Sequence, residues 1–387
     1  MEETNSDTLS AEQRKELYES LRKVWNLGAN VIVGWNCSSG GLTVYYLSLL
    51  ALPRAARQNA DLLSRNNHIV DAAHRSGLID AGCEHAELSL SFAMSDDAAT
   101  RRQVETIMRH YTVTHTACRA VALFDMVGFS LYSAFVRLAQ INVLSYHINL
   151  AAERVAAAGL PVDLTTTTTG DGFYIWNRIR SLEADLALYY ITVLTLAFNR
   201  AAMIASPHEP IPELRGCFDF GEHYEYYQAT GTKPDSRGYI VGDVTIKLAR
   251  LISAAQPRQF LVGNSVRRPE ADTGSETASD RLGQIDMSSF VLFARSNTRI
   301  LEGVGIGNGT IVRADTFLTG DRVSEGEFTI NKYVVTDKHG FAHRFFNARF
   351  DVQDSADQKI VAGLATGALS GFEGSRIEDE DIRIKVV

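Results

Sequence analysis

The chain has little cysteine and no excess of positive charge. Its 387 residues include four cysteines, Cys37, Cys83, Cys118 and Cys217. None of them forms a Cys-x-x-Cys pair or has a histidine at a spacing suited to zinc. This usage is typical of reduced thiols in a cytoplasmic protein. The formal net charge is -8, which excludes a broadly basic surface, so we expect no nucleic-acid partner.

Long hydrophobic runs are also scarce. Residues 1–16 are polar and charged, which excludes a secretory signal there. Residues 24–53 carry no charge, but asparagine, serine and glycine interrupt the apolar run. A membrane-spanning helix needs about 20 predominantly apolar residues. We therefore expect a buried helix pair with a polar turn at 36–41, and membrane insertion is the less favoured alternative. Residues 186–198 are too few for a span and predict a core helix within 182–205.

Two strand-like stretches each end at a single aspartate. Residues 121–124 form an apolar run that ends at Asp125, and five threonines at 165–169 lead into a Gly-Asp-Gly turn that carries Asp171. Threonine is β-branched and favours strands. If the two strands are neighbours, their carboxylates meet, and such a pair repels unless a cation lies between them. Two Mg²⁺ or Mn²⁺ ions are the usual solution.

The order of the elements predicts an α+β fold. Strand, helix and hairpin patterns follow one another from residue 112, and two such units form a ferredoxin-like sheet with helices on one face. We expect a helical N-terminal segment (1–111), a core (112–265), a flexible insert (266–287) and a β-rich C-terminal extension (288–387). The extension contains a clear hairpin around the turn at 337–340. It either completes the core sheet or forms a sensor.

Three segments, taken together, resemble the catalytic domain of class III nucleotidyl cyclases. Residues 124–130, Phe-Asp-Met-Val-Gly-Phe-Ser, are similar to the family's F-x-D-[IV]-x-G-F-[ST] signature, shortened by one residue between the phenylalanine and the aspartate. Gly170-Asp171-Gly172-Phe173 stands where the family has its second metal aspartate. Residues 242–251, ending in Ala-Arg-Leu, and the strand at 259–262 are similar to the family's helix and following strand. The resemblance covers roughly residues 115–265 and implies the class III cyclase fold.

The resemblance implies a role for each matched residue. Asp125, Asp171 and the backbone carbonyl of Met126 would hold two divalent cations (Mn²⁺ or Mg²⁺) per site. The residues that would lie beneath the triphosphate at the opening of a helix are Gly128, Phe129 and Ser130. Arg250 would stabilise the charge that develops at the α-phosphate. In this family the catalytic domains pair head to tail, so we expect a homodimer with shared active sites and a nucleoside triphosphate as substrate.

The positions that read the base depart from the family pattern. The family has a lysine (for ATP) or a glutamate (for GTP) four residues before the second aspartate, where this chain has Thr167. The partner position, about three residues before Gly242, is Tyr239. Neither purine code is present, although both side chains can hydrogen-bond a base. The chain in this respect resembles bacterial Pycsar-type cyclases, which make cyclic UMP or cyclic CMP in anti-phage defence. We therefore expect a pyrimidine substrate, with UTP favoured.

Two alternatives stay open. A divergent adenylate cyclase could bind ATP through a different adenine pocket. A catalytically silent, nucleotide-binding homologue is the other alternative, because Ile246 stands where the family has its transition-state asparagine. Lys247 or Thr245 could replace that asparagine. The intact pair of aspartates favours the enzyme.

Overall fold

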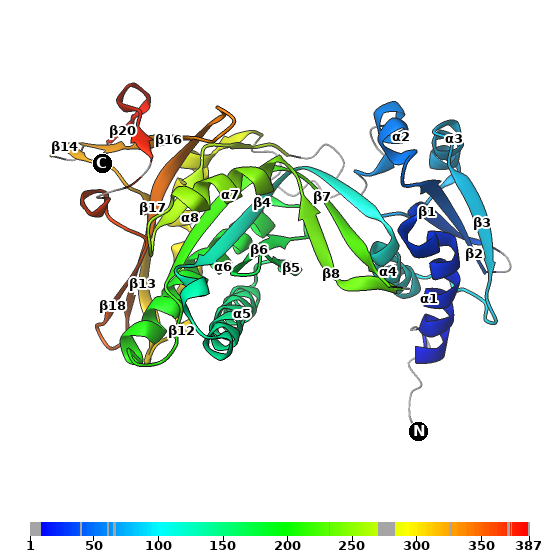
Figure 1. Ribbon diagram of the computed structural model, residues 1–387, viewed down its shortest axis with the longest axis horizontal. Coiled ribbons are helices and arrows are strands. Elements are labelled where there is room, and N and C mark those ends of the chain that lie inside the picture. The colour runs from blue at the N-terminus through cyan, green and yellow to red at the C-terminus, as the bar shows by residue number, and fades with distance from the viewer. Residues whose placement is uncertain are drawn as a thin grey trace. The chain divides into compact units, whose positions relative to one another are not determined.

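The computed structural model describes residues 9–38, 41–59, 62–64, 67–231, 233–269, 283–325, 327–369, 372 and 374–385. The chain forms two compact units (Figure 1). The N-terminal unit contains Met1–Ala117 and Tyr224–Val241, and the C-terminal unit contains Cys118–His223 and Gly242–Val387. This division differs from the one expected from the sequence. Residues 224–241 of the expected core group with the N-terminal residues, and the expected extension belongs to the same unit as the rest of the core.

The N-terminal unit combines helices with a three-stranded antiparallel sheet. Its helices are α1 (Ala11–Trp25), α2 (Leu52–Gln58), α3 (Ala72–Asp80) and α4 (Ala98–Met108), and its sheet has the order β1 (Asn30–Ser38), β2 (Gly41–Ser48), β3 (Glu84–Ser89). Ser10 and Gln13 form a capping box that starts α1. β8 (Lys233–Val241) pairs with the outer part of β7 (Leu214–Thr230) in this unit.

The expectation of a helix pair over residues 24–53 was wrong, and the N-terminal segment that was expected to be helical contains this sheet beside its helices. The region is the β1–β2 hairpin, in which Val31 pairs with Leu47 and Trp35 with Val44. Both faces of this hairpin are largely buried. Its strands therefore lack the polar–apolar alternation of a half-exposed strand, and such a run cannot be distinguished from a buried helix by periodicity alone. The β-branched and aromatic residues favour the strand.

The C-terminal unit is built on one large sheet, which confirms the predicted α+β class. Its main path has the order β12, β13, β17, β9, β7, β4, β6, β5. The bounds are β4 (Val113–Met126), β5 (Leu164–Thr168), β6 (Gly172–Asn177), β9 (Phe260–Gly263), β12 (Gly305–Ile306), β13 (Gly309–Leu318) and β17 (Ala342–Asp354). β16 (Lys332–Thr336) and β18 (Lys359–Ala362) also pair with β17, and β19 (Ser375–Arg376) pairs with β16. A small separate sheet contains β14 (Arg322–Ser324), β15 (Glu327–Ile330) and β20 (Ile382–Lys385).

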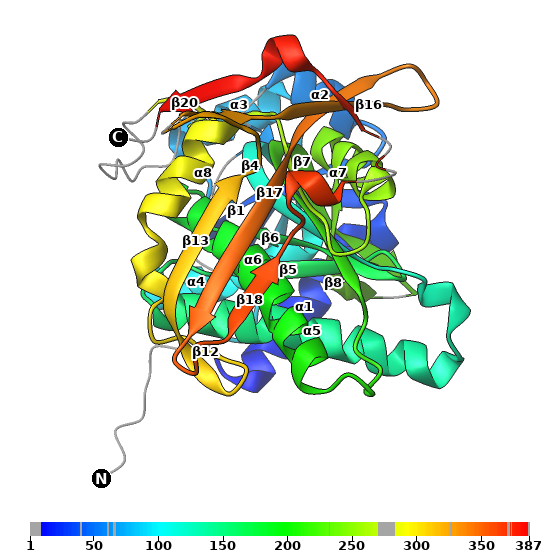
Figure 2. The same ribbon diagram turned by 90° about the vertical axis from the view of Figure 1, so that its left-hand side faces the viewer.

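Three helices pack on one face of this sheet and a fourth lies over the other (Figure 2). The first three are α5 (Ala134–Ala157), α6 (Leu182–Ala205) and α8 (Met287–Ser296). The Tyr189 ring of α6 lies 5.2 Å from the Phe218 ring of β7, and the Tyr190 hydroxyl donates to the Ala294 carbonyl of α8. On the opposite face, α7 (Asp243–Ala254) accepts a hydrogen bond from Tyr174 of β6 at its Thr245 carbonyl.

Helix α6 is the centre of the core. By length and composition it could cross a membrane, but 78% of its most apolar window is buried inside the protein. The sheet strands and α5 contribute the residues that cover it. The prediction of a core helix at residues 182–205 is therefore confirmed.

The C-terminal extension completes the core sheet. β17 pairs with β9 through Ala348 and Phe260, and the predicted hairpin of β16 and β17 is present. The sequence interpretation missed α8, although Met287, Phe290, Val291 and Ala294 follow helical spacing. Residues 270–282 of the expected insert lie outside the described residues. On either side of them, β10 (Val266–Arg267) pairs with β11 (Ile285–Asp286).

Candidate active site

The ends of β4 and β6 bring Asp125 and Asp171 together. Asp125 lies opposite Gly172 in the antiparallel register of β4 and β6. One residue further on, the Met126 amide donates to the Asp171 carbonyl at 2.9 Å. Asp125 therefore ends a buried strand, and Asp171 lies in the turn between β5 and β6. The two carboxylates that the sequence placed at strand ends are neighbours at one edge of the sheet.

The two glycines around Asp171 have separate roles. A Cβ atom on Gly172 would lie 1.9 Å from the Phe124 carbonyl oxygen, so β4 and β6 approach each other too closely for any other residue. Gly170 has φ +103° with open space around it, so its conformation rather than its surroundings favours glycine. The Gly-Asp-Gly sequence thus permits both the turn and the close pairing that holds Asp171 beside Asp125.

The structure adds a cation that the sequence interpretation missed. Arg215, at the start of β7, places its Nε 2.7 Å from Asp125 Oδ2 and donates through Nη1 to the Ala255 carbonyl at 2.9 Å. The neighbouring backbone is fixed as well, because the Val127 amide donates to the Glu213 carbonyl at 2.8 Å. A signal was present: Arg215 is the single cation of the strand start Leu214–Phe220, whose other charged residue is Asp219.

The surroundings raise the pKa of Asp125 above its ordinary value. Burial is the main cause, and the nearby Asp171 carboxylate adds to the rise, whereas the hydrogen bond and charge of Arg215 oppose it. The Asp125 side chain is 14% exposed. The ionised form is therefore costly here unless positive charge is supplied, and one guanidinium compensates for only part of the repulsion.

The donor set fits a hard divalent cation. Two carboxylates and the carbonyl groups of adjacent strand ends offer oxygen ligands, which Mg²⁺ and Mn²⁺ prefer. Arg215 already marks the place where positive charge is needed. Within the described residues, no cluster of three or more His, Cys, Asp or Glu side chains could hold a metal ion. The ligands that this edge offers include the pair of aspartates and backbone oxygens, among them that of Met126, whose side chain is buried.

Gly128, Phe129 and Ser130 follow Asp125 in a tight turn. Gly128 has φ +67° and precedes the 3-10 helix Phe129–Leu131. Helix α5 begins only at Ala134, with Ser133 as its cap. The expectation that residues 128–130 open this helix was therefore wrong, because the left-handed Gly128 and the short turn separate them from it. The turn still lies directly beside the candidate site.

The two predicted base-reading residues lie in different units. Thr167 in β5 pairs opposite Tyr174 and is 8% exposed. Tyr239 belongs to β8 in the N-terminal unit, where its ring lies 5.8 Å from that of Tyr226. The C-terminal unit by itself thus contains Thr167 and both aspartates.

Arg250 does not pair with either aspartate in the described part of the chain. It lies on α7, and its Nε is 3.5 Å from Asp337 Oδ2 in the turn between β16 and β17. Desolvation raises the pKa of Asp337, but hydrogen bonds from the Phe341 amide, His343 and the His339 amide outweigh it, and the pKa is lowered to about 2. Arg250 is therefore held by a carboxylate that stays ionised at any physiological pH.

The residues around Ile246 are already engaged. Ile246 is itself exposed. Lys247 Nζ lies 2.6 Å from Asp219 Oδ2 and donates to Ser265 Oγ at 2.9 Å. The Thr245 hydroxyl donates to the Gly242 carbonyl at 2.7 Å and closes the first turn of α7. In this conformation neither Lys247 nor Thr245 is available to replace the family's asparagine.

Comparisons with known proteins find similarity to solved structures, among them several cyclases. No protein-family model and no curated protein matches the chain. The adenylyl cyclase CyaB from P. aeruginosa is 12% identical over 64% of this chain and 98% of its own, with a TM-score of 0.36. A monomeric adenylate cyclase from Trypanosoma brucei is 12% identical over 64% and 93%, with a TM-score of 0.31. A dimeric guanylyl cyclase domain from Blastocladiella emersonii is 15% identical over 39% and 81%, with a TM-score of 0.31. Similarities at this level do not establish an activity.

Proposed function

We propose that this chain is a class III nucleotide cyclase that converts a pyrimidine nucleoside triphosphate, with UTP favoured, to the 3′,5′-cyclic monophosphate and pyrophosphate. The observation that carries the proposal is the pairing of β4 with β6, which places Asp125 beside Asp171. The positions of the turn at residues 128–130 and of the helix that carries Arg250 also support the proposal. Gly128 to Ser130 form the turn after Asp125, and Arg250 lies on the helix that precedes β9.

Each residue has a defined task in this mechanism. Two divalent cations, when bound, lower the pKa of the ribose 3′-hydroxyl and neutralise the triphosphate. Asp125 and Asp171 hold these ions, with the Met126 carbonyl as a further ligand. The backbone N–H groups of the turn at residues 128–130 contact the phosphates. Arg250 donates its fork of N–H groups to the charge that develops on the α-phosphate.

A head-to-tail homodimer with shared sites is part of the proposal. In the described residues of one chain, Arg250 pairs with Asp337 and not with the aspartates. A second protomer could bring its own Arg250 to the aspartates of the first, which is the family's arrangement. The base would contact Thr167 and Tyr239. Thr167 is buried, so this contact requires a conformation in which its hydroxyl is uncovered.

The biological role follows from the proposed product. A cyclic pyrimidine nucleotide made in the cytoplasm would act as a second messenger in bacterial anti-phage defence, as the resemblance to Pycsar-type cyclases implies. The sequence favours a pyrimidine over a purine substrate because residue 167 is neither the lysine nor the glutamate with which the family reads purines. ATP as substrate is the alternative within the same chemistry.

Two observations favour a catalytically silent homologue. Arg215 forms an ion pair with Asp125, and Ile246 supplies no polar group at the position of the family's asparagine. Incubating the purified protein with Mn²⁺ and each of the four labelled nucleoside triphosphates separates the possibilities. We expect a cyclic product from UTP or CTP. Cyclisation of ATP alone would exclude the pyrimidine substrate, and no product beside an active control cyclase would exclude the enzyme.

The metal ligands need their own test. We expect Asp171→Ala to lose turnover while the protein remains folded and dimeric. Turnover retained by this variant would show that the metal site is assigned to the wrong residues.

A further inference from the structure

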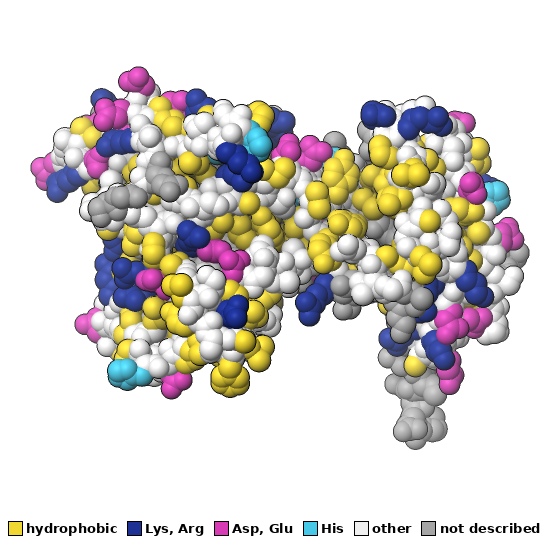
Figure 3. Space-filling model, viewed as in Figure 1, with side chains coloured by type: hydrophobic (Ala, Val, Ile, Leu, Met, Phe, Trp, Pro, Cys, Tyr) yellow, Lys and Arg dark blue, Asp and Glu magenta, His cyan; other side chains and the backbone are white. Residues whose placement is uncertain are grey.

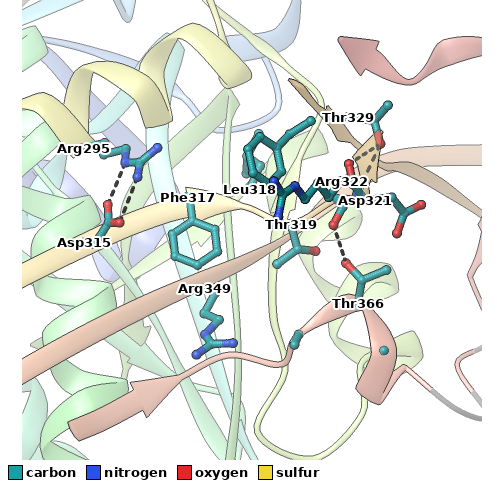
Figure 4. Close-up of a pocket in the computed structure, with 14 residues that line it drawn as sticks. Arg295, Asp315, Phe317, Leu318, Thr319, Asp321, Arg322, Thr329, Arg349 and Thr366 are labelled. Atoms are coloured by element: carbon teal, nitrogen blue, oxygen red, sulfur yellow. Dashed lines mark hydrogen bonds and ion pairs between the residues drawn. The ribbon is translucent and has the colours of Figure 1, made fainter. Parts of the chain in front are cut away.

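A second pocket lies in the C-terminal unit, separate from the aspartate pair. Its volume is about 670 Å³, within the range of sites that hold small organic ligands. Strand β13 and helix α8 form one side, β14 and β15 the other, and the loop 365–367 closes the bottom (Figure 4). Three strands, β17, β9 and β7, separate β13 from β4 in the sheet. At about 4.8 Å per strand, strands β13 and β4 are about 19 Å apart.

Phe317 forms a flat aromatic surface in this pocket. Two guanidinium groups lie near its ring, with Arg295 Cζ 5.9 Å and Arg349 Cζ 6.0 Å from the ring centroid (Figure 4). Both arginines are fixed by bidentate ion pairs. Arg295 donates to Asp315 at 2.7 and 2.9 Å, and Arg349 donates to Asp351 at 2.5 and 2.9 Å. Rigid aromatic and guanidinium planes of this kind stack on the faces of planar rings.

Arg322 supplies positive charge on the opposite wall. It lines the pocket from β14, and its Nε donates to the Ser324 carbonyl at 3.3 Å. It forms no ion pair with any residue that the structure describes. Asp321 beside it is compensated by Arg376, which pairs with it. The guanidinium of Arg322 is therefore available to an anionic ligand, whereas the carboxylates of the pocket are already paired.

Five Lys and Arg side chains and three aspartates, Asp315, Asp321 and Asp351, line the pocket and the hollow beside it. The chain carries a net charge of -8, yet Arg313 and Lys359 line an adjoining hollow that shares Asp315 with the pocket. Lys and Arg side chains gather over β13, β17 and β18 at the left of Figure 3. A small anion would be attracted to this end of the unit by the local field.

Gly320 lets the walls of the pocket meet at its base. A Cβ atom there would collide with the Thr329 carbonyl oxygen of β15. The close approach leaves the hydroxyls of Thr319 and Thr366 along the same edge. The pocket thus combines one stacking surface with one available cation.

We propose that this pocket binds a small anion that carries a planar aromatic ring, of the size and chemistry of a nucleoside monophosphate. The ring stacks on Phe317 and the anionic group pairs with Arg322. This site is independent of the proposed catalytic reaction. Its ligand needs neither Asp125 nor Asp171.

Calorimetric titration of the full chain in EDTA tests the proposal with four probes: AMP, UMP, adenosine and ribose 5-phosphate. EDTA removes divalent cations, so nucleotide binding through the aspartate pair is suppressed. We expect at least one monophosphate to bind more tightly than adenosine, which lacks the anion, and than ribose 5-phosphate, which lacks the ring. Arg322→Gln should weaken this binding about tenfold, and Phe317→Leu should weaken it about fivefold or more.

The controls separate this site from the candidate active site. Asp171→Ala should leave the affinity unchanged, because the two sites share no residue. Arg322 is exposed on a short strand, so its variant keeps the fold, and circular dichroism checks the Phe317 variant. The proposal is overturned if no probe binds at millimolar concentration, if both pocket variants bind normally, or if ribose 5-phosphate binds as tightly as the monophosphates.

Discussion

Arg215 Nε lies 2.7 Å from Asp125 Oδ2, so the first predicted metal ligand is already paired with a cation. Burial and the neighbouring Asp171 raise the pKa of Asp125, and Arg215 only partly opposes them. A divalent cation at this edge would supply the charge that is missing, but it would compete with Arg215 for the same carboxylate. Arg215 therefore couples the stability of the metal-free protein to its affinity for metal.

The first prediction concerns Arg215→Gln. Loss of the guanidinium leaves Asp125 partly buried without its partner, so the free energy of unfolding in EDTA should fall by about 1–3 kcal/mol. Affinity for Mn²⁺ should rise about tenfold, because the competing cation is gone. Titration calorimetry with Mn²⁺ and urea unfolding measure the two effects. Arg258→Gln, which removes a more exposed arginine paired with Glu213, is the matched control. An unchanged or weaker Mn²⁺ affinity would show that Arg215 does not occupy the cation's position.

A second prediction compares the two glycines around Asp171. Gly172→Ala forces β4 and β6 apart, since its Cβ would lie 1.9 Å from the Phe124 carbonyl oxygen, and should cost about 2–3 kcal/mol of unfolding free energy. Gly170→Ala has open space and only a strained φ of +103°, so it should cost about 1 kcal/mol. Thermal unfolding gives the order of the two variants. The reverse order would mean that the register between Asp125 and Gly172 is incorrect.

The sequence predicted the elements that carry the candidate site better than the region around them. Asp125 and Asp171 are recognisable because a strand that ends on a carboxylate is a local pattern. Arg215 is not, because its contact with Asp125 depends on the position of β7 in the sheet, 90 residues further along the chain. The β1–β2 hairpin was misassigned because its two faces are both covered, which removes the alternation that identifies strands. Both the Arg215–Asp125 contact and the burial of the hairpin depend on how segments distant in the sequence pack together. A single sequence gives little information about such packing.

The third prediction concerns Arg250 and Asp337. Arg250→Ala should lower kcat about 100- to 1,000-fold if Arg250 stabilises charge at the α-phosphate. Asp337→Asn removes the charge that holds Arg250 and keeps an oxygen for the Phe341 and His339 amides, and it should lower kcat about two- to fivefold. The pKa of Asp337 is about 2, so Asp337 stays ionised from pH 5 to pH 9, and the Asn variant should show a pH–rate profile of unchanged shape. Arg258→Ala is the control for an arginine just beyond the same helix. A small effect of Arg250→Ala on kcat would remove Arg250 from the proposed mechanism.

The last prediction concerns the buried pair His68–Glu105 of the N-terminal unit. Glu105 Oε1 lies 2.6 Å from His68 Nδ1, and the Trp35 indole donates to Oε2 at 2.9 Å. Burial raises the pKa of Glu105, but the hydrogen bonds and charge of His68 and the bond from Trp35 outweigh it, so the pKa is lowered. A lowered pKa contributes stability above the ordinary glutamate value, and this contribution is lost as the pH falls through the pKa of the folded state. Glu105→Gln should therefore cost about 3 kcal/mol of unfolding free energy at pH 7 and progressively less as the pH falls below 4.5.

Urea unfolding followed by tryptophan fluorescence measures this cost. A Trp176→Phe background leaves only the two tryptophans of the N-terminal unit as reporters. The control variant Glu19→Gln, at an exposed position, should show neither a loss of unfolding free energy at pH 7 nor a dependence of that loss on pH. A cost for Glu105→Gln that stays constant with pH would mean that the charge of Glu105 does not stabilise the unit.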